Sequence, residues 1–469
     1  MKALALTMLS ILAVGCTSSG RKSTQVAISP TPVAAMKPAP ASIEAVKVVA
    51  YEQAADSGEI LTQPPSVATA EPESLPPVEP DGITIENLQQ MALANNPAVA
   101  QAAARVDALQ GKWFQAGLPP NPSAGYAANE IGDEGHGGQQ GGFVGQEYIT
   151  GGKLRLDRAI VTQEIQRAQL QLHATQLRVT TDVRKASYAA LVAQRRVELA
   201  SELLRFSGEA VQASKELQEA EEIPRAGLLQ TEVEQQNAAI LQQTARNELT
   251  AAWRQLSATV GVELPVQQLV GDATRLPEML DWDEQLARVT ASSPELAAAM
   301  AEIVQRQAAL RRARVEPIPN LTTQVSVQFD DATNDTIASV QAGVPLPLWN
   351  RNQGGIRQAQ AEAAEATRNA ARIELDLKRR LAEAYQSYST ARMQAQTYAT
   401  TILPKAQQTL ELVQRGYRLG EVGYLDLLNA QRTFSQTNLA YLDALAVLWA
   451  NRTEIDGLLL TGSLAAPPQ

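Results

Sequence analysis

The chain has 469 residues and a formal net charge of −10, from 50 acidic and 40 basic residues. This balance argues against a nucleic-acid partner, because binding to phosphates requires concentrated basic charge. Aromatic residues make up only 4%, and Ala, Gln, Leu, Glu and Arg dominate long stretches. Such a composition is typical of extended helices and coiled coils rather than of a large mixed globular core.

The residues that usually carry catalysis or bind metals are scarce. The one cysteine, Cys16, excludes an internal disulfide framework. The two histidines, His136 and His173, are not at the spacing of a metal-ligand motif. No catalytic constellation is present either, so we predict that the protein is not an enzyme and has no cofactor and no firm metal site.

The N-terminus, residues 1–15, is predicted to be a lipoprotein signal peptide. Lys2 precedes an apolar run, Ala3 to Val14, that is too short to span a bilayer. The residues up to Cys16 resemble a bacterial lipobox, with Ala13 where that motif usually has Leu. We predict that Cys16 is acylated and anchors the chain in lipid, and Thr17 after it suggests sorting to the outer membrane. The alternative is an ordinary cleaved signal with a leftover cysteine.

Residues 16–82 are predicted to form a lipidated N-terminus followed by a disordered tether. The segment is rich in Pro and Ala and shows no periodicity, which is typical of disordered or polyproline-like chain. It is either a spacer between lipid and body or an inert tail. Residues 463–469 are predicted to be a C-terminal tail.

Between these segments the chain is an internal duplication, predicted to comprise residues 83–270 and 271–462. Asn96-Pro97 recurs as Ser293-Pro294, and Pro120-Asn121 recurs as Pro319-Asn320. The period of nearly 200 residues is too long for a solenoid and indicates duplication of one large supersecondary unit.

Each half is predicted to contain a helix, a strand pair, a very long helix and a returning helix. In the first half the helix is expected at 85–117, the strands at 123–128 and 143–149, and the long helix at Lys153–Glu219. In the second half, apolar and polar residues alternate over 324–329 and 338–344. This alternation is typical of a membrane barrel strand, and equally of a half-buried soluble hairpin.

The long helices carry heptad series of apolar residues that predict a packed seam. Val179 and Val183 belong to the series of the first helix, and Leu377 and Leu381, 198 residues further on, to those of the second. In the second helix, the series of Leu377 is expected to continue to Tyr398 and the series of Leu381 to Ile402. Pro224 and Gly420 then mark the two reversals that send helices back towards Val260 and Leu460.

The order of these motifs resembles the TolC family of outer-membrane efflux proteins over about four fifths of the chain, from Ile83 to Leu460. The segments that carry the resemblance are Leu93–Pro97, Gln115–Pro122, Gly145–Glu147, Gly151–Arg155, Gly343–Gly354 and Tyr417–Gly420. Two of them, Gly151–Arg155 and the Pro-Leu-Pro-Leu-Trp-Asn-Arg-Asn-Gln-Gly stretch within Gly343–Gly354, are most similar to the branch that serves cobalt–zinc–cadmium exporters.

The resemblance implies a mainly α fold with a small β part, assembled as a homotrimer. Each protomer would give four strands to a 12-stranded outer-membrane barrel on a periplasmic helical tunnel. A periplasmic adaptor and an inner-membrane RND pump are the implied partners, and divalent heavy-metal cations the implied cargo. The alternatives are a general drug efflux duct, a type I protein-secretion conduit and, from another class, a structural periplasmic coiled coil.

The resemblance also implies functional residues near the second reversal. Asp426 falls on the first of two aspartates that ring the closed end of the tunnel, and Asn429 falls on the second. Tyr417 matches a constriction tyrosine, and Val422 stands where a gating arginine is expected. Gly227 aligns with Asp426, so the first half brings no carboxylate.

The two reversals are predicted to be the docking tips for the adaptor. Their residues are Leu419, Gly420 and Glu421 in one tip and Ala220, Glu221 and Glu222 in the other. A helix often reverses through a glycine with positive φ. Only the second tip has one, which leaves open whether the two tips are equivalent.

Overall fold

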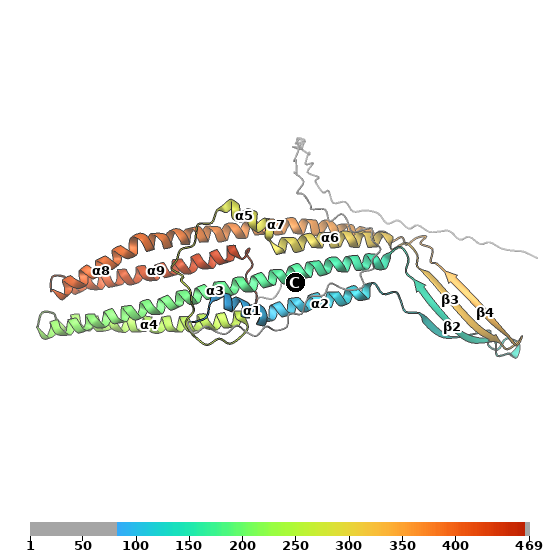
Figure 1. Cartoon of the computed structure of the whole chain (residues 1–469), viewed down its shortest axis with the longest axis horizontal. Helices are drawn as coiled ribbons and strands as arrows, with labels where there is room; N and C mark the ends of the chain where they lie inside the picture. Colours follow the sequence, from blue (N-terminus) through green and yellow to red (C-terminus); the bar gives the residue numbers. More distant parts are fainter. Residues whose placement is uncertain (1–81, 465–469) are drawn as a thin grey trace, which may run out of the picture. The chain divides into compact units, whose positions relative to one another are not determined.

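The computed structural model describes residues 82–464, which form a mainly helical protein with one small sheet (Figure 1). The predicted signal peptide, Cys16, nearly all of the predicted tether and the end of the predicted tail lie outside the described residues.

Both halves contain the predicted order of elements. The first half has α1 (Ile85–Asn95), α2 (Pro97–Ala116), β1 (Ser123–Asn129), β2 (Gln139–Tyr148), α3 (Lys153–Glu219) and α4 (Arg225–Val260). The second has α5 (Trp282–Ser292), α6 (Pro294–Val315), β3 (Leu321–Asp330), β4 (Asp335–Gly343), α7 (Gln353–Thr397), α8 (Leu403–Arg418) and α9 (Tyr424–Asp456). A short 3₁₀ turn (Asp133–Gly135) lies between β1 and β2, and a π-helical turn, η2 (Tyr398–Ile402), lies between α7 and α8.

The prediction of one helix over 85–117 is wrong, because the helix is interrupted at Asn96. Asn96 has extended backbone with ψ of 122°, and its side chain accepts a hydrogen bond from the Ala98 N–H at 2.9 Å. A residue before proline is disfavoured in the helical region, and Asn is a good N-cap. Ser293 caps α6 before Pro294 in the same way, so the duplicated Asn-Pro and Ser-Pro pairs mark a helix boundary in each half.

The four strands form one antiparallel sheet in the order β1-β2-β3-β4. The central pair, β2 and β3, joins the two halves. Val144 on β2, Val325 on β3 and Val340 on β4 lie side by side. These three side chains are 57%, 50% and 78% exposed. The predicted alternation is therefore present, with an apolar face that no other element of residues 82–464 buries. β1 and β4 are the edges.

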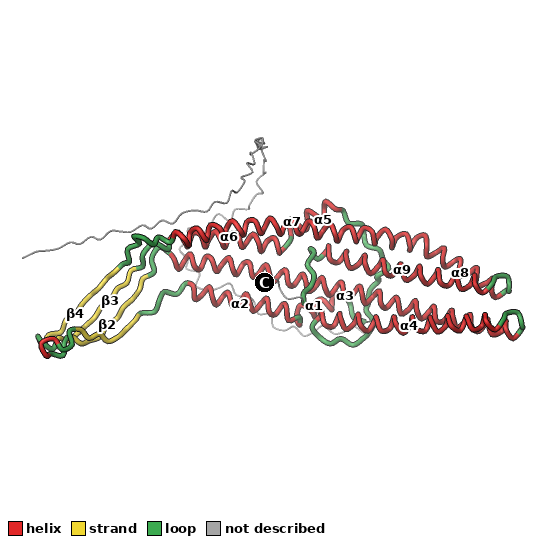
Figure 2. Tube along the Cα trace, turned by 180° about the vertical axis from the view of Figure 1, so that it is seen from behind, coloured by secondary structure: helices red, strands yellow, loops and turns green. Residues whose placement is uncertain are grey.

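The helices pack around α3, which contacts α2, α4, α6 and α9, while α7 contacts α6 and α9 (Figures 1 and 2). Val179, Val183, Leu377 and Leu381 are all fully buried in the core. The heptad seam predicted from both halves is therefore confirmed at its centre. In the part of the chain that the structure describes, no helix has both the length and the apolar character needed to cross a membrane.

The second long helix is interrupted, contrary to prediction. It changes to the π-helical turn η2 before continuing as α8, and Ile402 of the predicted seam is exposed. The buried positions resume at Ala406 and Leu410. Pro404 accounts for the interruption, because proline has no N–H to donate to the carbonyl four residues before it, and a π-helical turn absorbs the irregularity.

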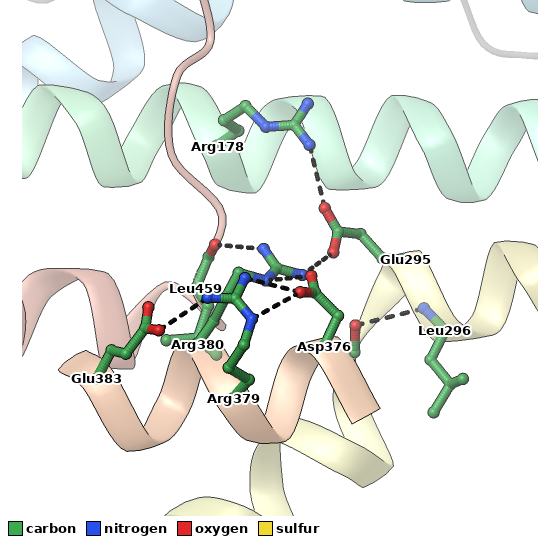
Figure 3. A network of polar contacts seen from close by, with 9 residues as sticks. Arg178, Glu295, Leu296, Asp376, Arg379, Arg380, Glu383 and Leu459 are labelled. Carbon is green, nitrogen blue, oxygen red and sulfur yellow. Dashed lines mark hydrogen bonds and ion pairs between the residues drawn. The ribbon is translucent and has the colours of Figure 1, made fainter. Parts of the chain in front are cut away.

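A network of charged side chains joins three helices near the middle of the helical part (Figure 3). Glu295, in the first turn of α6, lies 3.5 Å from the guanidinium of Arg178 on α3 and 2.5 Å from that of Arg380 on α7. Arg380 also donates to the Leu459 carbonyl at 3.2 Å. Arg380 thereby ties α7 both to α6 and to the turn that follows α9.

We predict that Arg380→Ala lowers the free energy of unfolding by about 1–3 kcal/mol, the usual cost of losing hydrogen bonds to charged groups. The neighbouring Arg379 serves as the matched control, since it is exposed and pairs only with Asp376 and Glu383 of its own helix. Thermal unfolding of Arg379→Ala should stay close to that of the wild type. Equal losses in the two variants would contradict a role for Arg380 between helices.

Candidate functional site

The two helical reversals lie together at the end of the helices remote from the sheet (Figures 1 and 2). The first joins α3 to α4, and the second joins α8 to α9. All six residues predicted as docking tips are exposed: Ala220, Glu221, Glu222, Leu419, Gly420 and Glu421.

The backbone of the two reversals is the same. The Glu222 N–H donates to the Leu217 carbonyl at 2.9 Å, and the Glu421 N–H donates to the Gly416 carbonyl at 2.9 Å. Both are the bonds of a Schellman motif. The residue in the left-handed conformation is Glu221 in one tip (φ 58°) and Gly420 in the other (φ 73°). The two tips are thus equivalent in backbone geometry, although only one has glycine where it is favoured.

Asp426 and Asn429 are both exposed in the first turns of α9. Residues three apart lie on the same side of a helix, so the two side chains share a face. The negative charge of Asp426 is favourable at a helix N-terminus. Leu427, between them, is only 2% exposed and fixes which face of α9 turns inward.

Tyr417, which was predicted to lie at the tunnel constriction, is buried inside the protomer. Its side chain is 4% exposed, and its hydroxyl is 3.1 Å from the Oγ atom of the fully buried Ser214. This contact links α8 to α3 close to the tips. Val422 packs on Gly416, where an added Cβ would come within 2.6 Å of its Cγ2 atom. Within one protomer, Tyr417 and Val422 therefore make packing contacts at the tip, and the role of Tyr417 at a constriction stays a prediction.

Tyr424 is a residue of this region that sequence reasoning missed. Its ring centroid is 6.4 Å from that of Tyr417, and its hydroxyl is buried with no hydrogen-bond partner among residues 82–464. Burial, with a smaller contribution from Glu234, raises the pKa of Tyr424 to about 12. The counterpart of Tyr424 in the first half is Arg225, so the duplication gave no signal for it.

The α3–α4 hairpin and the α8–α9 hairpin face each other near the tips. A cavity of 260 Å³ lies between them, lined by apolar residues such as Leu203, Phe206 and Leu410 and by polar ones from α4 and α9. One wall holds an ion pair in which Arg432 on α9 lies 2.5 Å from Glu234 on α4. A pocket and an ion pair therefore lie between the hairpins at this level.

A single chain does not gather metal ligands at this end or elsewhere in its described part. Over residues 82–464, no three His, Cys, Asp or Glu side chains come close enough together to hold a metal ion. Asp426 belongs to no such group among these residues.

Comparisons with known proteins give one consistent picture. Residues 286–459 match the family described as outer membrane efflux protein. The cobalt-zinc-cadmium resistance protein CzcC of Cupriavidus metallidurans is 29% identical over 380 residues, which cover 80% of this chain and 90% of that protein.

Two solved structures share the fold. A membrane protein from Pseudomonas aeruginosa has a TM-score of 0.69 at 16% identity and covers 80% of this chain and 92% of its own. CusC, a transmembrane channel, has a TM-score of 0.67 at 17% identity, with coverage of 81% and 92%. The fold described above, with its strands and long helices, is therefore shared with these two proteins.

We predict opposite effects for the two tyrosines of the tip. Tyr417→Phe leaves the buried Ser214 without its partner and should destabilise the tip by about 1–2 kcal/mol. Tyr424→Phe removes a buried hydroxyl that has no partner and should be neutral or stabilising by up to about 1 kcal/mol. Local opening measured by hydrogen exchange around the tip would separate the two variants, and equal protection in both would contradict the assignment.

The raised pKa of Tyr424 adds a pH dependence to this comparison. The folded state holds the phenolic proton more tightly than the unfolded chain, so this stability is fully present below pH 10 and is lost as the pH rises towards about 12. Tyr424→Phe should lessen that loss, whereas Tyr417→Phe should retain it.

The left-handed Glu221 predicts a simple stabilising substitution. Glu221→Gly should strengthen the first reversal by about 0.5–1 kcal/mol, since glycine adopts positive φ without the steric cost of a Cβ. Glu222 is an exposed neighbour outside the left-handed region, so Glu222→Gly is the matched control and should give no gain. Limited proteolysis at the first tip would measure both, and faster cleavage of Glu221→Gly would contradict the prediction.

Proposed function

We propose that this chain belongs to the outer membrane efflux protein family and is the outer-membrane exit duct of a tripartite efflux system. Its cargo would be divalent heavy-metal cations, conducted passively from the periplasm to the exterior. The observation that carries the proposal is the similarity over four fifths of the chain to CzcC, whose name describes resistance to cobalt, zinc and cadmium. The family is one of transport channels, and we propose no catalytic step.

The sheet supports a homotrimeric barrel. Its apolar face is exposed at Tyr126, Val144, Val325, Val327 and Val340, as expected for side chains that contact lipid. Its two edge strands lack partners within residues 82–464, and lipid cannot satisfy unpaired backbone groups. Three copies would close the edges into a barrel of 12 strands. The acylation of Cys16 would add a lipid anchor.

The helices support a periplasmic tunnel. α3 has 67 residues without a break, which corresponds to ~100 Å at 1.5 Å per residue. Helices of this length extend far beyond a membrane, away from the sheet. The buried heptad seam does not include every apolar residue of these helices. Val233, Ile240 and Leu412, for example, are exposed. Copies packed side by side would cover such residues and enclose a tunnel.

The tips support contact with other proteins. Leu419 and Leu425 are 66% and 65% exposed beside charged residues of the second reversal, and the first reversal exposes Glu221 and Glu222. We propose that both tips dock on a periplasmic adaptor. The energy for export would come from an inner-membrane RND pump, because this chain is proposed to conduct its cargo passively.

Asp426 supports a preference for cations. In a homotrimer the exposed carboxylate of Asp426 would occur three times around the axis, and a ring of carboxylates favours cations. Asn429 would add a polar but uncharged ring one turn further along α9. The exposed apolar face of the sheet argues against a purely structural coiled coil. Drug or polypeptide cargo would require the same fold and is distinguished by experiment.

We predict that deleting the gene sensitises cells to zinc, cobalt or cadmium, and that the wild-type gene restores resistance. Asp426→Asn should restore it only in part, while Asp426→Glu, which keeps the charge, should restore it fully. In planar bilayers, Asp426→Asn should also lower the selectivity for cations over anions, because three charges are removed from one constriction.

Growth inhibition by lipophilic drugs alone would contradict the metal cargo and leave a drug efflux duct. A defect only in the secretion of a polypeptide would favour the type I conduit. If the purified protein in detergent were a monomeric rod without heat-modifiable trimers, the duct itself would be excluded.

A further inference from the structure

The segments that join the sheet to the helices form a junction at one end of the helical part (Figures 1 and 2). Side-chain contacts hold these segments to one another. The Asn352 amide donates to the Ala313 carbonyl at 2.8 Å, and the guanidinium of Arg158 lies 4.7 Å from the ring centroid of Trp113. The junction is therefore one surface built from four parts of the chain, residues 112–122, 149–158, 311–320 and 344–357.

The junction is strongly basic, although the protein as a whole is acidic. It contains nine Lys or Arg residues and two carboxylates, a net charge of +7, whereas the whole chain has −10. Both carboxylates, Asp157 and Glu316, pair with Arg312. The charge of the other exposed arginines is left without an ion pair among residues 82–464. These arginines are Arg155, Arg311, Arg314, Arg351 and Arg357.

Two of these arginines lie where a helix gains nothing from a cation. Arg155 is in the first turn of α3, and Arg351 directly precedes the N-cap of α7. The N-terminus of a helix carries partial positive charge, so a further cation there is unfavourable. Neither helix has an acidic residue in its first turn to offset this effect. The stability of the helices therefore does not explain these charges, whereas it does explain Arg314 in the last turn of α6.

An exposed apolar surface reaches the same level from the sheet. Tyr148 ends β2 and Val344 follows β4, each on the apolar face of its strand, and they are 53% and 49% exposed. The loop after Val344 then exposes Leu346 and Trp349, the latter to 86%. Aromatic side chains at the end of an apolar band are typical of the boundary between lipid chains and headgroups.

We propose that the junction binds anionic phospholipids, with Trp349 among the headgroups and Arg155, Arg351 and Arg357 on their phosphates. The inference rests on the proposed duct, in which the helices lie in the periplasm and the junction meets the inner leaflet of the outer membrane. Clusters of Lys and Arg beside a membrane segment attract anionic lipids. An apolar face within the lipid chains and cations on the headgroups would together fix the depth of the sheet in the membrane.

The apolar side chains favour a lipid surface over a soluble anion as the partner. The basic surface borders Trp349 and Leu346 in one continuous exposed stretch. A soluble anion would leave these side chains in water, whereas a lipid surface accepts the apolar groups and the charges at the same time. The arginines supply the preference for lipids with a net negative charge, because a neutral headgroup offers less attraction.

Lipid contact at Trp349 is measured by fluorescence quenching of the full-length protein. The protein is reconstituted in phosphatidylcholine vesicles with a minor fraction of brominated phosphatidylglycerol or of brominated phosphatidylcholine. The chain has five tryptophans, so the difference between the wild type and Trp349→Phe isolates the signal of Trp349. Brominated phosphatidylglycerol should quench this signal more strongly than brominated phosphatidylcholine does.

Removal of charge tests the role of the arginines. A variant with Arg155→Gln, Arg351→Gln and Arg357→Gln should lose the preference for phosphatidylglycerol, by up to about fivefold for each charge removed. The same three positions changed to Lys should retain the preference, because the charge is kept.

Three arginines of α4 provide a matched control. Arg225, Arg246 and Arg254 are exposed and form no ion pair within the described part of the chain. Changing all three to Gln removes the same net charge at a distance from the junction. This variant should prefer phosphatidylglycerol as strongly as the wild type does.

The outcomes separate this inference from the proposed function. Equal quenching by the two brominated lipids in the wild type, or a preference that survives the Gln changes at the junction, would overturn the inference and leave the duct intact. Loss of the preference in inorganic phosphate at constant ionic strength would also overturn it, because the arginines would then bind a soluble anion. A protein that neither inserts into vesicles nor conducts ions would overturn the proposed duct as well.

Discussion

The pairing of backbone groups at the edges of the sheet is the constraint on which the rest of the architecture depends. Four strands with an exposed apolar face cannot stand alone in lipid, because the outer N–H and C=O groups of β1 and β4 would be unpaired. Adding copies edge to edge is the remedy that needs no new element. In the proposed ring of strands, the helices that continue from them, α3 and α7, would follow the same axis.

The duplication explains how one chain can satisfy this constraint and still differ between its halves. The equivalent seam residues Val179 and Leu377 are both fully buried, so the packing common to the halves has been kept. Aromatic contacts outside the seam have diverged. Tyr188 stacks on Trp449 with ring centroids 4.0 Å apart, whereas its counterpart Tyr385 meets the edge of Trp282 at 5.3 Å. The halves therefore share the same arrangement of elements and the same buried seam, but different aromatic contacts stabilise each half.

Sequence reasoning succeeded where a feature depends on local periodicity or on proline and glycine residues that mark the ends of helices. The alternation around Val325 and the heptads around Val179 report directly which face is apolar, and both faces are present in the structure. It failed at Asn96 and at Pro404, where a single residue overrides the helical pattern around it. It also could not foresee the neighbours of Tyr417 and Tyr424, since contacts between α8, α3 and α9 depend on how the hairpins pack. The sequence did not show that the two tips have the same backbone geometry, because Glu221 adopts the left-handed conformation that is usually found at glycine.

The asymmetry between the hairpins bears on how a duct of this kind could open. α3 runs unbroken to its tip, but the path from α7 to α8 passes through the π-helical turn at Tyr398–Ile402, and such turns inside α-helices are frequent at functional sites. Asp426 belongs to the hairpin that contains this turn. Between the hairpins lie a cavity and the pair of Arg432 with Glu234 rather than a dense core. In the proposed duct, the pocket level is therefore a less densely packed boundary between the hairpins than the buried seam around Val179 and Leu377, and Asp426 lies on the hairpin whose first helix is interrupted.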